Sequence, residues 1–103
     1  MTNKYRDFEV LVNEHLTENK NEADKYLELA FKEYDKTGDE KVLLIALKQV
    51  AKAKGGFSEL SKKTGLSRES LYKTLSEKGN PKLHTFKAIL DALGYHFTVQ
   101  HIE

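Results

Sequence analysis

Residues 58–75 read Ser-Glu-Leu-Ser-Lys-Lys-Thr-Gly-Leu-Ser-Arg-Glu-Ser-Leu-Tyr-Lys-Thr-Leu, and this stretch decides the fold. It predicts two short helices joined at Gly65, because glycine tolerates the positive φ that a tight turn needs. Ser58 and Ser67 are placed to cap these helices, since a serine hydroxyl can accept a free backbone N–H. The leucines at 60, 66, 71 and 75 are spaced to face one small core. The stretch therefore has the signature of a helix-turn-helix motif.

The residues after this stretch predict its end and one further helix. Gly79-Asn80-Pro81 ends the second helix, since glycine suits the position after a helix and proline cannot continue one. Apolar residues at helical spacing from Leu83 to Leu93 then predict a helix that stops at Gly94.

Three more helices are predicted upstream, from apolar residues that recur at i, i+3, i+4 and i+7. They cover residues 3–17, 22–36 and 40–54, and the last has the widest apolar face, so it is expected to be the most buried. Gly38 ends the second of these helices and Asp39 caps the third. The sequence thus predicts an all-α bundle of about six helices.

From Tyr95 to Val99, the apolar residues recur at every second position instead of at helical spacing. Tyr95, Phe97 and Val99 alternate with other residues, and aromatic and β-branched side chains favour a strand. A single strand cannot satisfy its own backbone, so we expect it to pair antiparallel with the same strand of a second copy. The alternative is a strand that lies alone on the helices. The first interpretation makes the protein a homodimer, with Tyr95, Phe97 and Val99 as its dimerisation residues.

Length and composition indicate one compact domain without cofactors. The chain has 103 residues and no cysteine, which excludes disulfides and thiolate chemistry. No apolar run approaches a membrane span, and the first residues lack the apolar core of a signal peptide, so a cytoplasmic protein without a membrane partner is expected. The four histidines have no metal-ligand spacing, and no catalytic arrangement can be nominated. We therefore expect neither a metal site nor an enzyme.

Charge is distributed unevenly along the chain. Residues 1–40 hold six basic and eleven acidic side chains, net −5, whereas residues 41–90 hold eleven basic and three acidic ones, net +8. A basic region around a helix-turn-helix is typical of a module that meets phosphates. The acidic region is explained most simply as a solvated surface.

In the 58–75 stretch, one face of the second helix, which Ser67 caps, is polar, as expected of a helix that enters the major groove of duplex DNA. Arg68 is the best candidate to contact guanine, and Ser70 or Tyr72 to touch a thymine methyl group or a phosphate. The full predicted DNA-binding set is Ser58, Lys62, Ser67, Arg68, Glu69, Ser70, Tyr72, Lys73, Lys78, Asn80 and His84. The alternative interpretation is that the lysines only make the surface soluble and that Tyr72 packs against the neighbouring helix.

The motif also carries a family resemblance, over residues 58–94. The matching residues are Leu60, Gly65-Leu66-Ser67, Leu71, Pro81, Leu83, Thr85-Phe86 and Leu93-Gly94. This pattern resembles the Xre/Cro-like helix-turn-helix family, also called the lambda-repressor-like domains. One departure is Ser61, where these domains usually carry alanine. A serine packed there must bond back to a carbonyl or reach the surface.

A narrower resemblance extends over residues 22–100. Its residues include Leu71-Tyr72-Lys73, Gly79-Asn80-Pro81 and Leu93-Gly94-Tyr95 with Phe97 and Val99. These look like the HigA-type addiction-module antidotes, the small antitoxins of type II toxin–antitoxin pairs. No reliable pattern covers residues 1–20.

The resemblance implies a dimer that binds its own operator DNA and neutralises a basic toxin of the RelE/ParE-like kind. Residues 1–40 would then be a toxin-facing acidic helical region. Residues 41–103 would hold the DNA-binding motif and the dimerisation strand, within one compact unit. Two alternatives stay open: a stand-alone Xre-family transcriptional regulator without a toxin partner, and a protein-interaction module that does not bind DNA.

Overall fold

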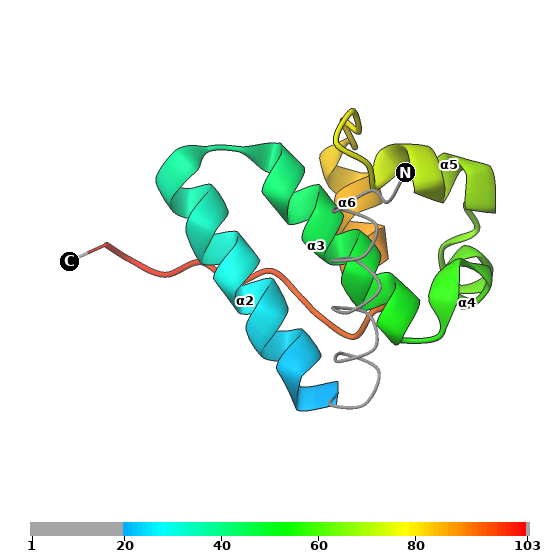
Figure 1. Cartoon of the computed structure of the whole chain (residues 1–103), viewed down its shortest axis with the longest axis horizontal. Coiled ribbons are helices and arrows are strands. Elements are labelled where there is room, and N and C mark those ends of the chain that lie inside the picture. Colours follow the sequence, from blue (N-terminus) through cyan, green and yellow to red (C-terminus); the bar gives the residue numbers. More distant parts are fainter. Residues whose placement is uncertain (1–19, 103) are drawn as a thin grey trace, which may run out of the picture.

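The computed structural model describes residues 20–102, and these fold into five α-helices (Figure 1). The helices are α2 (Lys20–Thr37), α3 (Glu40–Ala53), α4 (Gly56–Thr64), α5 (Arg68–Thr74) and α6 (Leu83–Ala92). The predicted helical class is confirmed for this part of the chain, and no strand occurs in it. The helix predicted over residues 3–17 lies outside the described residues.

The corner between α2 and α3 is built from local signals that the sequence carries. Gly38 has φ +71° and donates its N–H to Tyr34 O at 2.7 Å, which closes the end of α2. Asp39 then caps α3, its Oδ1 accepting the Lys41 N–H at 3.0 Å. Both predicted roles are confirmed, and they turn the chain so that α3 packs back along α2.

One apolar core joins the five helices. Its buried members are Ala23, Leu27, Ala30, Leu43, Leu44, Ala46, Leu47, Val50, Ala51, Phe57, Leu60, Leu71, Leu75, Ile89, Leu90 and Leu93. α3 lies between α2 on one side and the α4–α5 pair on the other (Figure 1), and it buries the most side chains of the five. This confirms the prediction that the helix over 40–54 is the most buried.

A polar side chain also lies inside this core. Gln49 of α3 is 1% exposed, and neither its Nε2 nor its Oε1 has a hydrogen-bond partner within the described residues. An unpaired buried amide costs free energy, because folding removes its bonds to water.

The turn between α4 and α5 follows the predicted design at its centre. Gly65 has φ +77° and donates its N–H to Ser61 O at 2.9 Å. Ser67 caps α5, its Oγ accepting the Ser70 N–H at 3.1 Å. The Ser61 hydroxyl donates to Leu66 O at 2.5 Å, so this departure from alanine adds a bond across the turn.

The start of α4 differs from the prediction. Ser58 is not a helix cap, because α4 begins at Gly56 with Gly55 as its N-cap residue. Both glycines have positive φ, at +107° and +81°, so the backbone reverses sharply there without any side-chain cap. Ser58 therefore lies in the first turn of α4, with its hydroxyl at the surface.

The end of α5 also differs. The helix stops at Thr74, with Leu75 as its C-cap residue, so Gly79 does not terminate it. Gly79 is needed for another reason: a Cβ atom at this position would lie 1.9 Å from Thr74 O. The loop after α5 folds back against the end of the helix, and only a residue without a side chain permits this approach.

The tail after α6 is held against the helices at its start and free at its end. Residues 95–102 have no regular secondary structure, so the predicted strand is not formed within the described chain. Tyr95 and Phe97 contact the protein's own helices, whereas Val99 and Ile102 are 99% and 89% exposed. A strand paired across a dimer requires a second copy and stays a prediction.

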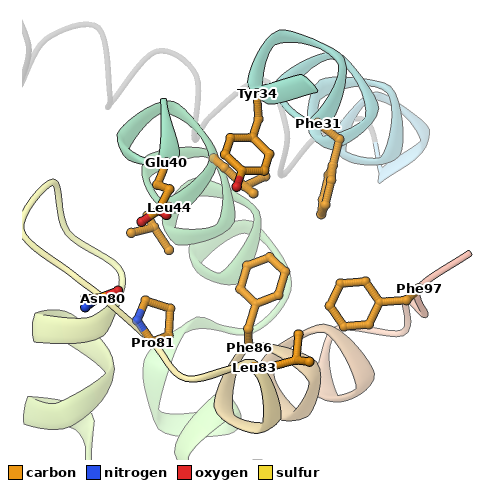
Figure 2. A pocket seen from close by; sticks show the side chains of 10 residues that line it. Phe31, Tyr34, Glu40, Leu44, Asn80, Pro81, Leu83, Phe86 and Phe97 are labelled. Atoms are coloured by element: carbon orange, nitrogen blue, oxygen red, sulfur yellow. The ribbon is translucent and has the colours of Figure 1, made fainter. Parts of the chain in front are cut away.

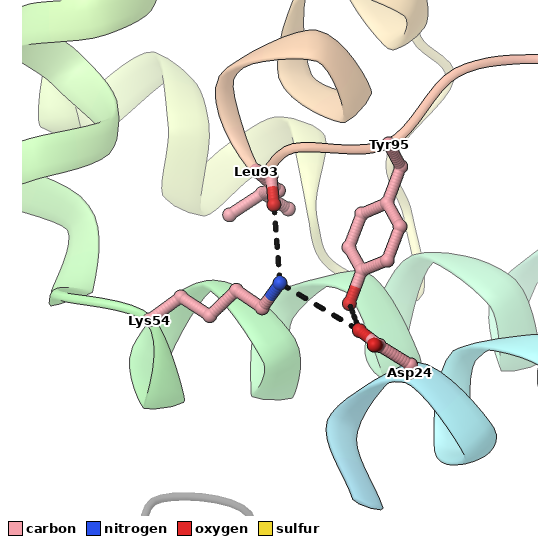
Figure 3. Close-up of polar contacts among 4 residues, drawn as sticks. All are labelled: Asp24, Lys54, Leu93 and Tyr95. Atoms are coloured by element: carbon pink, nitrogen blue, oxygen red, sulfur yellow. Dashed lines mark hydrogen bonds and ion pairs between the residues drawn. The ribbon is translucent and has the colours of Figure 1, made fainter. Parts of the chain in front are cut away.

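Four groups fix the start of the tail (Figure 3). The Tyr95 hydroxyl donates to Asp24 Oδ1 at 2.6 Å. Lys54 Nζ donates to Leu93 O at 3.2 Å, lies 3.7 Å from Asp24 Oδ1 and stands 4.3 Å from the centre of the Tyr95 ring. This cluster ties the tail to α2 and to the end of α3.

Candidate nucleic-acid interface

Arg68 is the first residue of α5 and projects from its exposed side. Its Nη1 donates to Ser58 Oγ at 3.2 Å, so α4 positions the guanidinium across the turn. Arg68 makes no ion pair with any described residue, so no carboxylate in this part of the chain competes with a ligand for it. A guanidinium has five N–H donors in a planar fork, so one bond to Ser58 leaves capacity for a bidentate partner.

Among the other residues at the start of α5, one caps the helix and two are exposed to solvent. Ser67 is occupied by the cap, and its hydroxyl also donates to Ser70 Oγ at 2.9 Å. Glu69 and Ser70 are exposed. Ser67 therefore shapes the helix start, and Arg68 with Ser70 is better placed to contact a ligand.

Tyr72 is half exposed, at 49%, although aromatic rings usually lie deeper. Its ring packs on buried Phe57 with centroids 4.3 Å apart and planes 42° apart. The packing interpretation of Tyr72 is confirmed for one side of the ring, which lies against α4. The other side faces solvent, so its contact with DNA stays a prediction. Phe57, which supports Tyr72 from below, is absent from the predicted site, and its only signal is its apolar character beside Ser58.

The remaining predicted residues surround α5. The described structure places Lys62, Lys73, Lys78, Asn80 and His84 at the surface, on α4, α5, the loop after α5 and the start of α6. Asn80 also lines a cavity described below. All eleven residues of the predicted DNA-binding set are exposed, so none of them needs repacking to be reached.

A cavity of ≈ 340 Å³ opens behind this surface, between α2, α3, α6 and the tail (Figure 2). Its lining is Phe31, Tyr34, Glu40, Leu43, Leu44, Asn80, Pro81, Leu83, Phe86 and Phe97. Phe86 stands in the middle, with its ring centroid 6.3 Å from that of Phe31 and 5.5 Å from that of Phe97. The sequence did not predict this cavity, because it forms where three helices and the tail meet.

Residues 20–102 contain neither a metal-binding cluster of side chains nor a helix suited to span a membrane. No group of three or more histidine or carboxylate side chains in this range is arranged to hold a metal ion. None of the helices described there is both long and apolar enough to cross a membrane.

Comparison with known families identifies the chain. The model of a family described as "Probable addiction module antidote protein" matches residues 5–101. The protein belongs to this antidote family. The match begins within the first helix predicted from the sequence, where no family pattern was identified, and it continues through the tail. An antidote implies a toxin as its counterpart.

A relative supports membership in the antidote family. A protein of Haemophilus influenzae, described as uncharacterised, is 35% identical over 100 residues, which cover 97% of this chain and 95% of that protein. No solved structure matches the chain significantly. The resemblance to an antidote is therefore confirmed, and the narrower Xre/Cro-like and HigA-type assignments belong to the proposal that follows.

Proposed function

We propose that this antidote protein is a HigA-type antitoxin of the Xre/Cro-like class. It represses its own operon as a sequence-specific DNA-binding homodimer in the cytoplasm, and it neutralises a basic RelE/ParE-like toxin. The observation that carries the DNA-binding role is the arrangement of Arg68. It stands exposed at the first position of α5, bonded to Ser58 and free of any carboxylate partner among the described residues.

Two copies of α5 enter successive major grooves about 34 Å apart on a pseudo-palindromic operator. Arg68 donates two hydrogen bonds to guanine O6 and N7, and the Ser58 hydroxyl keeps the guanidinium in the required plane. Tyr72, supported by Phe57, contacts a thymine methyl group or a phosphate. Glu69 is suited to accept a bond from a cytosine amino group, since a carboxylate is an acceptor only.

Phosphate contacts set the register of the helix on the duplex without reading sequence. The residues assigned to this role are Ser58, Lys62, Lys73, Lys78, Asn80 and His84, whereas Ser67 caps the helix that carries Arg68. The net charge of +8 over residues 41–90 supports the assignment, because neutralised phosphates release counterions.

A salt series tests the DNA-binding role. The protein is titrated onto a duplex from its own promoter and onto a scrambled duplex of equal length, between about 50 and 200 mM salt. Preferential binding of the promoter, with affinity that falls steeply with salt, is expected. Equal weak binding to both duplexes would leave an interaction module that does not read DNA.

The toxin-facing role is assigned to the acidic region of residues 1–40. Its described part, residues 20–40, carries seven acidic and four basic side chains. Glu28, Glu33 and Asp35 are exposed on α2. Complementary charge steers association with a basic toxin. Residues 41–103 carry the DNA-binding motif and the dimer contacts.

Deletion of residues 1–40 does not test this assignment, because it would also remove Ala23, Leu27 and Ala30 from the core. Surface variants are cleaner. Glu28, Glu33 and Asp35 are changed together to lysine, and a control variant changes Lys25, Lys32 and Lys36 to glutamine. Binding is measured to the product of the adjacent small basic reading frame. The acidic-to-lysine variant is expected to lose toxin binding and keep operator binding. Unchanged toxin affinity would refute the assignment, and the absence of such a gene would favour a stand-alone regulator.

A further inference from the structure

The free end of the tail and the apolar cavity are complementary features of the same face. Leu83 and Phe97 at the cavity are 76% and 42% exposed, although all of the lining except Glu40 and Asn80 is aromatic or aliphatic. Beyond Phe97, Val99 and Ile102 project into solvent and touch no core residue. Exposed apolar groups gathered in this way mark an interaction surface.

After Tyr95, the tail backbone is also unpaired within the described residues. Tyr95 donates its N–H to Leu90 O at 2.9 Å, and no later residue up to 102 makes a backbone–backbone hydrogen bond in the described chain. Residues 95–102 contain no Lys, Arg, Asp or Glu, so two tails can lie side by side without like-charge repulsion. An extended segment with free backbone groups and neutral side chains is suited to pair with its own copy.

Side-chain direction limits how two tails can pair. In a strand, residues i and i+2 share a face, and residues directly opposite in an antiparallel pair also share a face. Tyr95 and Phe97 point toward the protein's own helices (Figures 2 and 3). A register centred on Thr98 sets the partner's Val99 opposite Phe97, on the side of the cavity. It also sets the partner's His101 opposite Tyr95, beside the carboxylates of Asp24 and Glu28.

Neighbouring registers do not give this fit. A pairing centred on Val99 places both valines on the two-fold axis, away from the cavity. A pairing centred on Phe97 places the two phenylalanines against each other, although each already packs on Phe86 of its own chain. A register centred between two adjacent residues turns the partner's Val99 to the opposite face of the strand pair, away from the cavity.

We propose that the cavity is the docking site for the tail of a second copy, whose Val99 enters it between Leu83 and Phe97 through antiparallel pairing centred on Thr98. The contact is reciprocal, so each protomer inserts one valine into its partner and receives one valine in its own cavity. In this register the partner's His101 can donate an imidazole N–H to the carboxylates around Tyr95, where Lys54 already pairs with Asp24. This inference rests on the proposed homodimer and adds its contact residues.

Cysteine crosslinking of the full-length protein tests the register, since the native chain has no cysteine. Thr98→Cys brings two sulfur atoms together at the axis, where opposite Cα atoms lie about 4.5–5.5 Å apart, within disulfide range. Gln100→Cys is the matched control, because its two copies are about four residues apart along the pair, roughly 14 Å. Under mild oxidation Thr98→Cys is expected to form a covalent dimer, and Gln100→Cys is expected to stay unlinked.

Light scattering across a concentration series provides the second measurement. Val99→Asp and Leu83→Asp should each weaken the dimer by at least about tenfold, because each places a carboxylate in the apolar contact. Gln100→Asp should change the dissociation constant little. All three residues are exposed in the single chain, so circular dichroism should show an intact fold in every variant.

Each other outcome overturns the inference in a distinct way. Crosslinking of Val99→Cys in place of Thr98→Cys would put Val99 on the axis and outside the cavity. A wild-type dimer that neither cysteine links, and that Val99→Asp leaves intact, would assign the cavity to residues 1–19 or to another protein. A wild-type monomer at all concentrations would refute the homodimer itself, and with it the dimeric part of the proposed function.

Discussion

The hydroxyl of Tyr95 donates a 2.6 Å hydrogen bond to Asp24 Oδ1 across 71 positions of the chain. It joins the start of the tail to α2, and Lys54 supports both groups from the end of α3. Burial raises the pKa of Tyr95 far above its ordinary value, and the Asp24 hydrogen bond and the nearby carboxylates raise it further. The direction in which Phe97 and Val99 leave the helices depends on this bond.

Tyr95→Phe should therefore lower the free energy of unfolding by about 0.5–1.5 kcal/mol at pH 7, the usual net contribution of one hydrogen bond. Urea denaturation measures the change. Asp24→Asn and the double variant complete a cycle that separates the bond from other effects of each substitution. Additive effects in this cycle would show that the two side chains are not coupled.

The same substitution should change the dependence of stability on alkaline pH. Because the folded protein holds the Tyr95 proton more tightly than the unfolded chain, this group stabilises the fold fully below the unfolded pKa of about 10, and the contribution is lost as pH rises further. Wild-type stability should fall more steeply than that of Tyr95→Phe between about pH 9.5 and 11. Parallel curves would contradict the raised pKa, since all other titrating groups are shared.

Gln49→Met should stabilise the protein by about 1–3 kcal/mol, because it replaces a buried amide that has no partner among residues 20–102 by an apolar side chain of similar length. The denaturation midpoint in guanidinium chloride measures the gain. Gln49→Glu serves as the contrasting variant and should be strongly destabilising at pH 7, since it buries a charge. A less stable Gln49→Met would mean that the amide is satisfied in solution.

Gly79→Ala should lower stability by more than about 1 kcal/mol, because its Cβ would lie 1.9 Å from Thr74 O and the backbone must move. Gly38→Ala is the comparison: it has open space around its Cβ and only the strain of φ +71°. Thermal unfolding should rank Gly79→Ala as the more damaging. An equal or milder effect would show that the loop after α5 can relax without cost.

Arg68→Ala should reduce operator affinity by about 1–3 kcal/mol and relax specificity at one base position, whereas Lys78→Ala should weaken all duplexes alike and reduce the salt slope by about one. A panel of single-base operator variants at two salt concentrations distinguishes these patterns. If Arg68→Ala lowered every affinity by the same factor, Arg68 would be a phosphate contact.

Local signals in the sequence predicted much of the fold. The roles of Gly38, Asp39, Gly65 and Ser67 depend on φ and on hydrogen bonds within a few residues, so each could be predicted without tertiary contacts. Ser58 was wrong as a cap because the helix start depends on two consecutive positive-φ glycines, which also permit other turns.

Features that depend on distant contacts could not be predicted. The support of Tyr72 by Phe57 joins two helices, and the bond from Arg68 to Ser58 spans 10 positions. Gly79 appeared to be a helix stop, whereas its approach to Thr74 follows from the path of the loop. The tail alternates as a strand would, but a strand forms only against a second chain, so periodicity alone could not show where it lies.

The position of α2 has a consequence for turnover in the cell. This helix contributes Ala23, Leu27 and Ala30 to the core that supports α4 and α5, and its outer side carries the acidic surface assigned to the toxin. If the protein has the function proposed above, a protease that removes α2 would abolish operator binding and toxin capture in one step. Under that proposal, degradation of this antidote would release the toxin and derepress its operon together, without leaving a half-functional fragment.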